Sequence, residues 1–345
     1  MNPMITSILI INLATGTIIT MSSYHWLIAW MGLELNTMAI LPIISKSHHP
    51  RATEASTKYF LTQATASAMI LFSSITNAQM TGQWSILQLE DPLAQVLLTM
   101  ALAMKLGLAP AHFWLPEVLQ GSSLKTTLII ITWQKLAPMT LMLMTWNQIS
   151  TMTITMMGTL SVIVGGLGGL NQTQLRKTIA YSSISHLGWM ATIITKSNKL
   201  ALLNLTMYIL ISTPLMLSLI TTSMKTTKDL MMTWTTSPML TTLTMIILLS
   251  LGGLPPLTGF LPKWLTLEEL LSQNMVPLAT ILAITTLLSL FFYLRLSYSL
   301  SMTIAPSPTK TVSKWRLKTN TMTLLLSTTM PMSILGLTIA PLMKP

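Results

Sequence analysis

Apolar residues run along this chain in long stretches, each separated from the next by a short polar segment. A helix of about 20 apolar residues, rising 1.5 Å per residue, crosses the ~30 Å hydrocarbon core of a bilayer. The pattern therefore predicts an all-α, polytopic membrane protein with about 11 transmembrane helices. The predicted spans are 3–22, 25–44, 57–79, 92–115, 124–145, 149–170, 177–196, 199–222, 238–265, 272–296 and 322–343.

Composition agrees with a membrane protein and excludes several kinds of site. Only 8% of the 345 residues are charged, against ~25% in soluble proteins. The net charge of +11 does not indicate nucleic-acid binding, because the basic residues lie mostly in loops between spans. The chain has no cysteine, which excludes thiolate metal sites and iron–sulfur ligation. We therefore expect no metal, no redox cofactor and no nucleic-acid partner on this chain.

The charged loops alternate along the chain. One side is acidic, with Glu90, Asp91, Glu268 and Glu269, and carries few basic residues. By the positive-inside rule, the basic side faces inward, so the N-terminus is predicted inside and the C-terminus outside. The basic segment 297–321 is expected to touch anionic lipid. The basic side carries Lys46, Arg51, Lys58, Lys125, Arg176, Lys177, Lys225, Lys228, Lys310, Lys314, Arg316 and Lys318.

Four charged residues fall inside predicted spans: Glu34, Lys105, Lys135 and Lys263. Each charge deep in a bilayer costs about 2.5–3.5 kcal/mol on insertion scales, so four cost on the order of 10–14 kcal/mol if they simply add. That cost is as large as the net stability of a whole domain. These residues must therefore face a polar, hydrated interior.

A buried ion pair that only joins helices is one explanation for these charges. It accounts for Glu34 with one lysine and leaves the other lysines of the set without an acid. A lysine in a dry interior can release its proton near neutral pH, so proton transfer is the favoured interpretation. His112 and His186 are further candidates as proton relays, although each could equally be a packing residue.

Two apolar stretches are interrupted by matching breaks, "KLGLAPAHFWLP" at 105–116 and "GGLPPLTGFLPKW" at 252–264. Both contain Gly-Leu-x-Pro and then Leu-Pro, with a lysine beside the break. Unwound backbone in a membrane is tolerated only where protein buries it or water reaches it, and paired breaks indicate inverted repeats. The break residues are Gly107, Pro110, Gly253, Pro255 and Pro256.

Two other motifs are interpreted as structural. "GGLGG" at 165–169 has the small-xxx-small spacing that favours close helix packing over a ligand role. The adjacent His48 and His49 lie in a loop, and two neighbouring histidines alone make a poor metal site.

The segments "GLELN", "KLGLAPAHFWLPEV", "LRKTIAYSSISHLGWM" and "GGLPPLTGFLPKW" make the whole chain similar to the antiporter-like membrane subunits of respiratory complex I. The resemblance implies two inverted five-helix repeats, each with one broken helix. The family plan has fourteen helices, and a shorter mitochondrial form lacks the first three. On this plan the repeats are about 1–145 and 149–296 of a single transmembrane domain, followed by 297–345 as a basic loop and terminal helix.

The resemblance also implies residue roles. Glu34 and Lys105 would form a modulating ion pair, Lys135 would be the central lysine, and Lys263 the second-half residue. Some family members carry glutamate at the last position, so lysine here leaves open whether protons exit through this subunit.

The resemblance therefore implies that this chain is a core membrane subunit of NADH:ubiquinone reductase (H+-translocating, EC 7.1.1.2). Such a subunit would move protons through a hydrated chain of buried lysine and glutamate. NADH, FMN, iron–sulfur clusters and ubiquinone would bind other subunits. Neighbouring membrane-arm chains, accessory subunits and lipids such as cardiolipin are the expected partners, in the mitochondrial inner membrane. Two alternatives stay open: a subunit that transmits electrostatic coupling without net transport, and a cation/proton antiporter.

Overall fold

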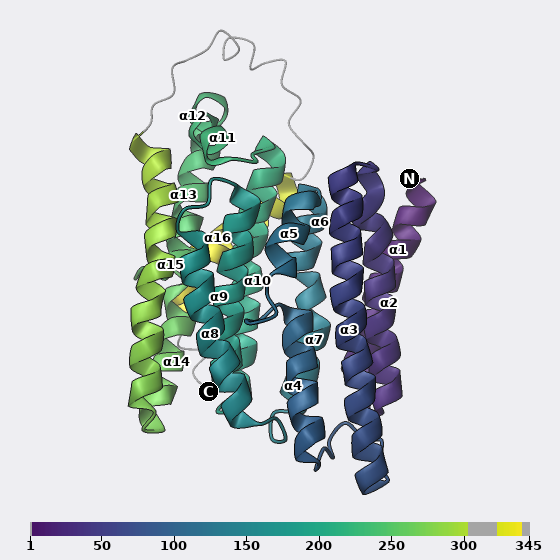
Figure 1. The fold of residues 1–345 in the computed structure, drawn as a ribbon. Coiled ribbons are helices and arrows are strands. Elements are labelled where there is room, and N and C mark those ends of the chain that lie inside the picture. Colours follow the sequence, from purple (N-terminus) through teal and green to yellow (C-terminus); the bar gives the residue numbers. More distant parts are fainter. Residues whose placement is uncertain (1, 303–322, 340–345) are drawn as a thin grey trace. The chain divides into compact units, whose positions relative to one another are not determined.

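The computed structural model describes residues 2–302 and 323–339, and these fold into helices (Figure 1). The predicted loop residues Lys310, Lys314, Arg316 and Lys318 lie outside the described residues. The helices are α1 (Pro3–Ser22), α2 (Trp26–Ile44), α3 (Pro50–Thr81), α4 (Pro92–Leu106), α5 (Trp114–Gly121), α6 (Leu124–Ile131), α7 (Leu136–Met144), α8 (Thr151–Gly169), α9 (Leu175–Ile194), α10 (Asn198–Thr222), α11 (Thr227–Met231), α12 (Thr233–Thr236), α13 (Pro238–Gly252), α14 (Phe260–Ser272), α15 (Val276–Met302) and α16 (Thr323–Leu335).

The predicted spans correspond to these helices, which confirms the all-α membrane fold. In the described part of the chain, six helical segments are long and apolar enough to cross a bilayer. Helices α3 and α9 have 32 and 20 residues and are also long enough, but they carry more polar side chains. The spans at 92–115 and 238–265 are each divided into two helices. The short helices α11 and α12 were not predicted, because they lie in a polar loop.

The chain divides into two compact units. Unit 1 comprises 1–161 and 190–198, and unit 2 comprises 162–189 and 199–345. Unit 1 contains the broken pair α4–α5, and unit 2 contains the broken pair α13–α14. In unit 1, α1 packs along α2, which in turn packs along α3 (Figure 1).

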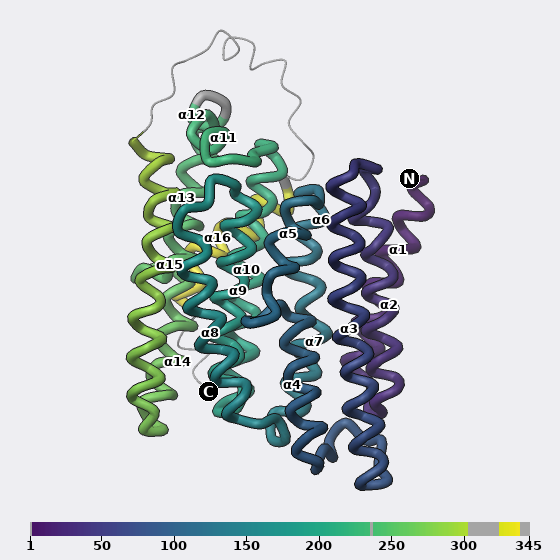
Figure 2. Tube along the Cα trace, in the orientation of Figure 1, coloured from purple at the N-terminus to yellow at the C-terminus, as the bar shows by residue number. Residues whose placement is uncertain are grey.

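Both broken helices end in the same backbone geometry. Gly107 and Gly253 have φ of +82° and +81°, a left-handed conformation that glycine adopts without steric cost. In each case the glycine N–H and the next N–H bond back to carbonyls of the last turn, which closes the helix end. Figure 2 shows the chain leaving the helical path between α4 and α5 as a loop.

Side chains beyond each break satisfy carbonyls that the break exposes. The Trp114 indole Nε1 donates to the Met104 carbonyl at 3.1 Å. The Lys263 ammonium donates to the Gly252 carbonyl at 2.8 Å. In the second break, Gly259 approaches so closely that an added Cβ would lie 1.7 Å from the Ser250 carbonyl oxygen. In each break, a side chain from beyond the interruption thus bonds one carbonyl at the helix end.

A third interruption, which the sequence analysis did not predict, divides the span at 124–145. A 3₁₀ turn at Trp133–Lys135 separates α6 from α7. Pro138 lies four residues after Gln134, and a proline cannot donate to the carbonyl four residues earlier and clashes with it. The proline thus moves the start of α7 to Leu136 and leaves Lys135 in the irregular turn.

The glycines of 165–169 pack helices closely, as predicted. A Cβ on Gly165 would lie 2.7 Å from the Ser185 backbone nitrogen in α9. A Cβ on Gly169 would lie 2.8 Å from the Phe292 ring in α15. Both contacts lie within unit 2, so these glycines allow α9 and α15 to approach α8.

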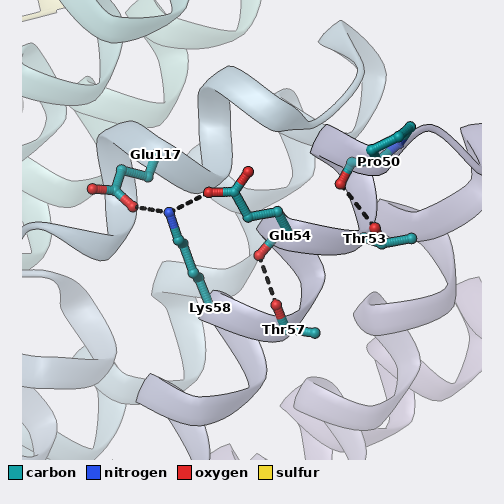
Figure 3. Close-up of polar contacts among 6 residues, drawn as sticks. All are labelled: Pro50, Thr53, Glu54, Thr57, Lys58 and Glu117. Carbon is teal, nitrogen blue, oxygen red and sulfur yellow. Dashed lines mark hydrogen bonds and ion pairs between the residues drawn. The ribbon is translucent and has the colours of Figure 1, made fainter.

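A charged cluster joins α3 to α5 on the surface of unit 1 (Figure 3). The Lys58 ammonium lies 2.5 Å from the Glu54 carboxylate and 2.6 Å from that of Glu117. The hydrogen bond and charge of Lys58 hold the pKa of the Glu54 carboxyl below its ordinary value. Because these side chains are 40–60% exposed, the cluster that links the two helices adds little stability.

We expect Trp114→Phe to destabilise the first break. The substitution keeps a buried ring but removes one of the two donors to the Met104 carbonyl, which retains the Gly107 N–H, and the loss of one hydrogen bond costs about 0.5–1.5 kcal/mol. Thermal unfolding of the purified protein, followed by circular dichroism, would show a lower midpoint. Trp264→Phe, at a ring that is 49% exposed, is the matched control and should leave the midpoint nearly unchanged. Equal midpoints for both variants would contradict the capping role.

Candidate functional site

Two of the predicted lysines lie together inside unit 1. Lys105 and Lys135 are 6% and 3% exposed, and both line one enclosed cavity of about 20 Å³. A cavity of this size holds about one water molecule. Helices α2 to α7 and the 3₁₀ turn at Trp133–Lys135 supply its walls. The polar lining consists of Asn36, Thr37, Tyr59, Gln63, Lys105, Gln134 and Lys135.

The two interruptions of the helices place these lysines. Lys105 lies in the last turn of α4, two residues before the left-handed Gly107. The partial negative charge at a helix C-terminus favours a cation there. Lys135 ends the 3₁₀ turn that Pro138 enforces. Each lysine is therefore held at a helix end, where the backbone can adjust more readily than in the middle of a continuous helix.

Several polar atoms meet at this cavity without a protein partner. Among the described residues, no hydrogen bond is made by Lys105 Nζ, Asn36 Oδ1 or Gln134 Nε2. Buried polar groups are nearly always satisfied, by protein or by ordered water. Lys105 Nζ and Gln134 Nε2 are both donors, and a water molecule in the cavity could accept from them, whereas Asn36 Oδ1 lies against Gly16 of α1. The cavity thus has both the volume and the chemistry to be hydrated.

Glu34 lies beside this cavity but forms no ion pair with Lys105. Its side chain is half-buried, and its carboxylate accepts a hydrogen bond from the Thr37 hydroxyl at 3.1 Å. Within residues 2–302 and 323–339, the side-chain ion pairs are those that Lys58 makes with Glu54 and Glu117. The Glu34 carboxylate is therefore bonded to a hydroxyl of its own helix in this structure.

Five polar side chains of this site were not predicted from the sequence: Asn36, Thr37, Tyr59, Gln63 and Gln134. Tyr59 is 2% exposed, and its hydroxyl lies 3.5 Å from Gln134 Oε1. Gln63 is 4% exposed and lies one turn further along α3. The sequence does contain a signal for such residues, namely a polar side chain inside an apolar span. Its transfer into the bilayer costs free energy, as the transfer of a charge does.

His112, a predicted relay, lies in the loop of the first break and does not line this cavity. Its Nδ1 is 3.2 Å from the Pro110 carbonyl oxygen, and its ring packs against Phe113 at a centroid distance of 4.1 Å. The side chain is 6% exposed. The structure therefore places His112 near the break and apart from the lining of the lysine cavity.

Lys263 occupies the second break, in unit 2. Its ammonium donates to the Gly252 carbonyl, the last of α13. Its aliphatic chain covers Gly253, where an added Cβ would lie 2.9 Å from Lys263 Cδ. The side chain thus caps a helix C-terminus, an environment that stabilises a cation.

His186 also lies in unit 2, in α9. Its ring centroid is 5.3 Å from that of Tyr208 in α10, and the Tyr208 side chain is 3% exposed. The packing of α9 against α10 therefore brings a histidine and a tyrosine together, which no local sequence pattern could predict.

The chemistry available in both units is proton exchange between side chains. Lysine, histidine, tyrosine and serine can each donate a hydrogen bond, and a bound water extends their reach. Within residues 2–302 and 323–339, there is no group of three or more histidine or acidic side chains that could hold a metal ion. His49 instead accepts a hydrogen bond from the Arg51 backbone at the start of α3.

Comparison with known proteins shows the family to which this chain belongs. Residues 23–289 match the family described as NADH:quinone oxidoreductase/Mrp antiporter, and residues 290–344 match the NADH dehydrogenase subunit 2 C-terminus. NADH-ubiquinone oxidoreductase chain 2 of Varanus timorensis is 60% identical over 99% of both chains. That of Latimeria chalumnae is 54% identical, again over 99% of both.

A solved structure gives the same result. A chain of respiratory complex I from Thermus thermophilus, determined with bound aureothin, superposes with a TM-score of 0.85 at 26% identity. The match covers 99% of this chain and 80% of that one. The matched residues include both breaks and all four buried charges. The chain belongs to the NADH:quinone oxidoreductase/Mrp antiporter membrane family and, within it, to the NADH-ubiquinone oxidoreductase chain 2 proteins.

Proposed function

We propose that this chain is a core membrane subunit of respiratory complex I, NADH:ubiquinone reductase, and contributes to proton translocation. Family membership supports the assignment to the complex. The observation that carries the proton-transfer role is the polar cavity of unit 1, with two almost fully buried lysines and unpartnered polar atoms. A merely structural site would leave fewer buried groups without a partner.

Within unit 1, a proton on Lys105 would pass through the cavity to Lys135. Water in the cavity would accept from one ammonium and donate to the other amine, so each lysine alternates between charged and neutral forms. Glu34 would bias this exchange, because it lies one helical turn from Thr37 of the cavity lining and a carboxylate favours a nearby cation. In unit 2, Lys263, His186 and Tyr208 would serve as further exchange groups.

The energy for this transport would come from redox chemistry on other subunits. We expect NADH, FMN, iron–sulfur clusters and ubiquinone to bind elsewhere in the complex, and no cofactor to bind this chain. The partners would be neighbouring antiporter-like membrane chains, accessory subunits and lipids. The location would be the mitochondrial inner membrane, with the N-terminus on the matrix side, as the basic loops predict.

The first test removes the central lysine. Lys135→Met keeps the side-chain volume but cannot carry a proton, so the assembled complex should lose most of its proton pumping. Proton uptake per electron would be measured in proteoliposomes, with NADH oxidation by an artificial acceptor as a check that the redox part is intact.

Lys125→Met is the matched control, because Lys125 is an exposed residue at the start of α6. It should pump normally. Unchanged pumping in a fully assembled Lys135→Met complex would rule out the proposed role of Lys135.

The second test separates a pump from a subunit that only transmits electrostatic coupling. Lys263→Met removes both the charge and the hydrogen bond to the Gly252 carbonyl. If this chain moves its own protons, the number of protons pumped per electron should fall. If it only couples its neighbours, turnover should slow while the ratio stays constant.

Lys263→Arg keeps the charge and the donor and is the control for the structural role of the cap. It should keep assembly and most of the proton-to-electron ratio. A ratio that stays normal in Lys263→Met would favour the coupling alternative over transport through this chain.

A further inference from the structure

An open groove runs between α13 and α15 in unit 2, which pack side by side (Figure 1). Its volume is about 680 Å³, which lies within the usual range of ligand sites. The lining is mainly apolar, with Leu249 and Leu254 on one side and Phe291 and Leu294 on the other, and α15 adds Arg295, Ser297, Tyr298 and Ser301. The Phe291 and Leu294 side chains are 57% and 40% exposed, so the groove opens to the surroundings of the chain.

Arg295 lines this groove and has no acidic partner in the part of the chain that the structure describes. Its Nη1 donates to the Leu170 carbonyl at 2.9 Å and lies 3.4 Å from Asn171 Oδ1. These contacts orient the guanidinium and use only one of its nitrogens, whereas the group has five N–H donors. An exposed arginine on an apolar helix face is costly in a membrane unless an anion accompanies it.

The same arginine lines a second, smaller pocket, whose lining is partly polar. This pocket has a volume of about 70 Å³ and includes Gln172, Thr178, Thr227 and Ser299 beside apolar residues such as Phe292. Arg295 therefore lies where a partly polar pocket meets a mainly apolar groove. A ligand that fits both must have a compact polar head and a long apolar tail.

The depth of Arg295 suits a lipid headgroup. It lies seven residues before the end of α15 at Met302, which corresponds to roughly 10 Å along the helix. From there the groove follows Leu294 and Phe291 away from that end and reaches Leu254, in the second helix break. An acyl chain lying along it would point from the membrane surface toward the bilayer interior.

We propose that the α13–α15 groove is a binding site for an anionic phospholipid, with the headgroup phosphate on Arg295 and one acyl chain in the groove. Bulk lipid of any kind would fill an apolar groove. The arginine and the partly polar pocket add a preference for a negatively charged headgroup, since basic pockets between membrane helices select such lipids. This site is independent of the proton-transfer groups assigned above.

The test uses the intact complex and two photoreactive lipids. A phosphatidylglycerol and a phosphatidylcholine, each with a diazirine in the acyl chain, would be incubated with the detergent-purified complex and cross-linked. Mass spectrometry of peptides would then locate the label. We expect the anionic probe to label 245–254 and 291–301, and the zwitterionic probe to label them about ten-fold less, the factor that one charge-assisted hydrogen bond provides.

Two variants test the two halves of the site. Arg295→Gln should reduce labelling by the anionic probe about ten-fold, and Leu294→Trp should reduce it by filling the groove without changing the charge. Arg51→Gln, at an exposed arginine in unit 1, is the matched control and should label normally. Equal labelling by both lipids, no label in these peptides, or unchanged labelling of Arg295→Gln would overturn the proposal.

Discussion

Backbone groups inside a bilayer must find partners within the protein, because the hydrocarbon core offers none. This constraint determines where the chain can be irregular. Both broken helices close their ends at a left-handed glycine, and a side chain from beyond the break then bonds an exposed carbonyl. Trp114 does so in unit 1 and Lys263 in unit 2. The irregular backbone is thereby stable, and it brings polar groups into a region that would otherwise hold only apolar side chains.

The same constraint connects backbone geometry with function. Lys105 and Lys135 lie next to interruptions, where a helix end or a 3₁₀ turn replaces continuous helix. Such positions supply polar backbone and allow space for water beside a charge. In unit 1 this space is a small polar cavity, and in unit 2 the lysine is bound directly to a helix end. The two units therefore use related breaks to create different surroundings for their lysines.

Much of the fold could be predicted from the sequence, because apolar spans of membrane length and Gly-Pro breaks are local signals. The interruption at Trp133–Lys135 was missed, although Pro138 is visible in the sequence, because a proline near the start of a helix is equally compatible with a straight span. The charged residues inside the spans could be singled out from the sequence, because placing a charge in a bilayer costs free energy. The contact of the His186 ring with Tyr208 could not be foreseen, since it depends on how α9 and α10 pack. The expected contact of Glu34 with Lys105 is also a tertiary feature, and the structure has Glu34 bonded to Thr37 instead.

The central claim is that the cavity between Lys105 and Lys135 is hydrated and allows protons to pass. The most direct test is a cryo-EM map of the assembled complex, at a resolution that shows ordered water, examined around Asn36 Oδ1, Lys105 Nζ and Gln134 Nε2. The account predicts at least one ordered water within hydrogen-bonding distance of Lys105 Nζ and of one of the two amide groups. A dry cavity, with these atoms bonded directly to one another or to the carboxylate of Glu34, would contradict it.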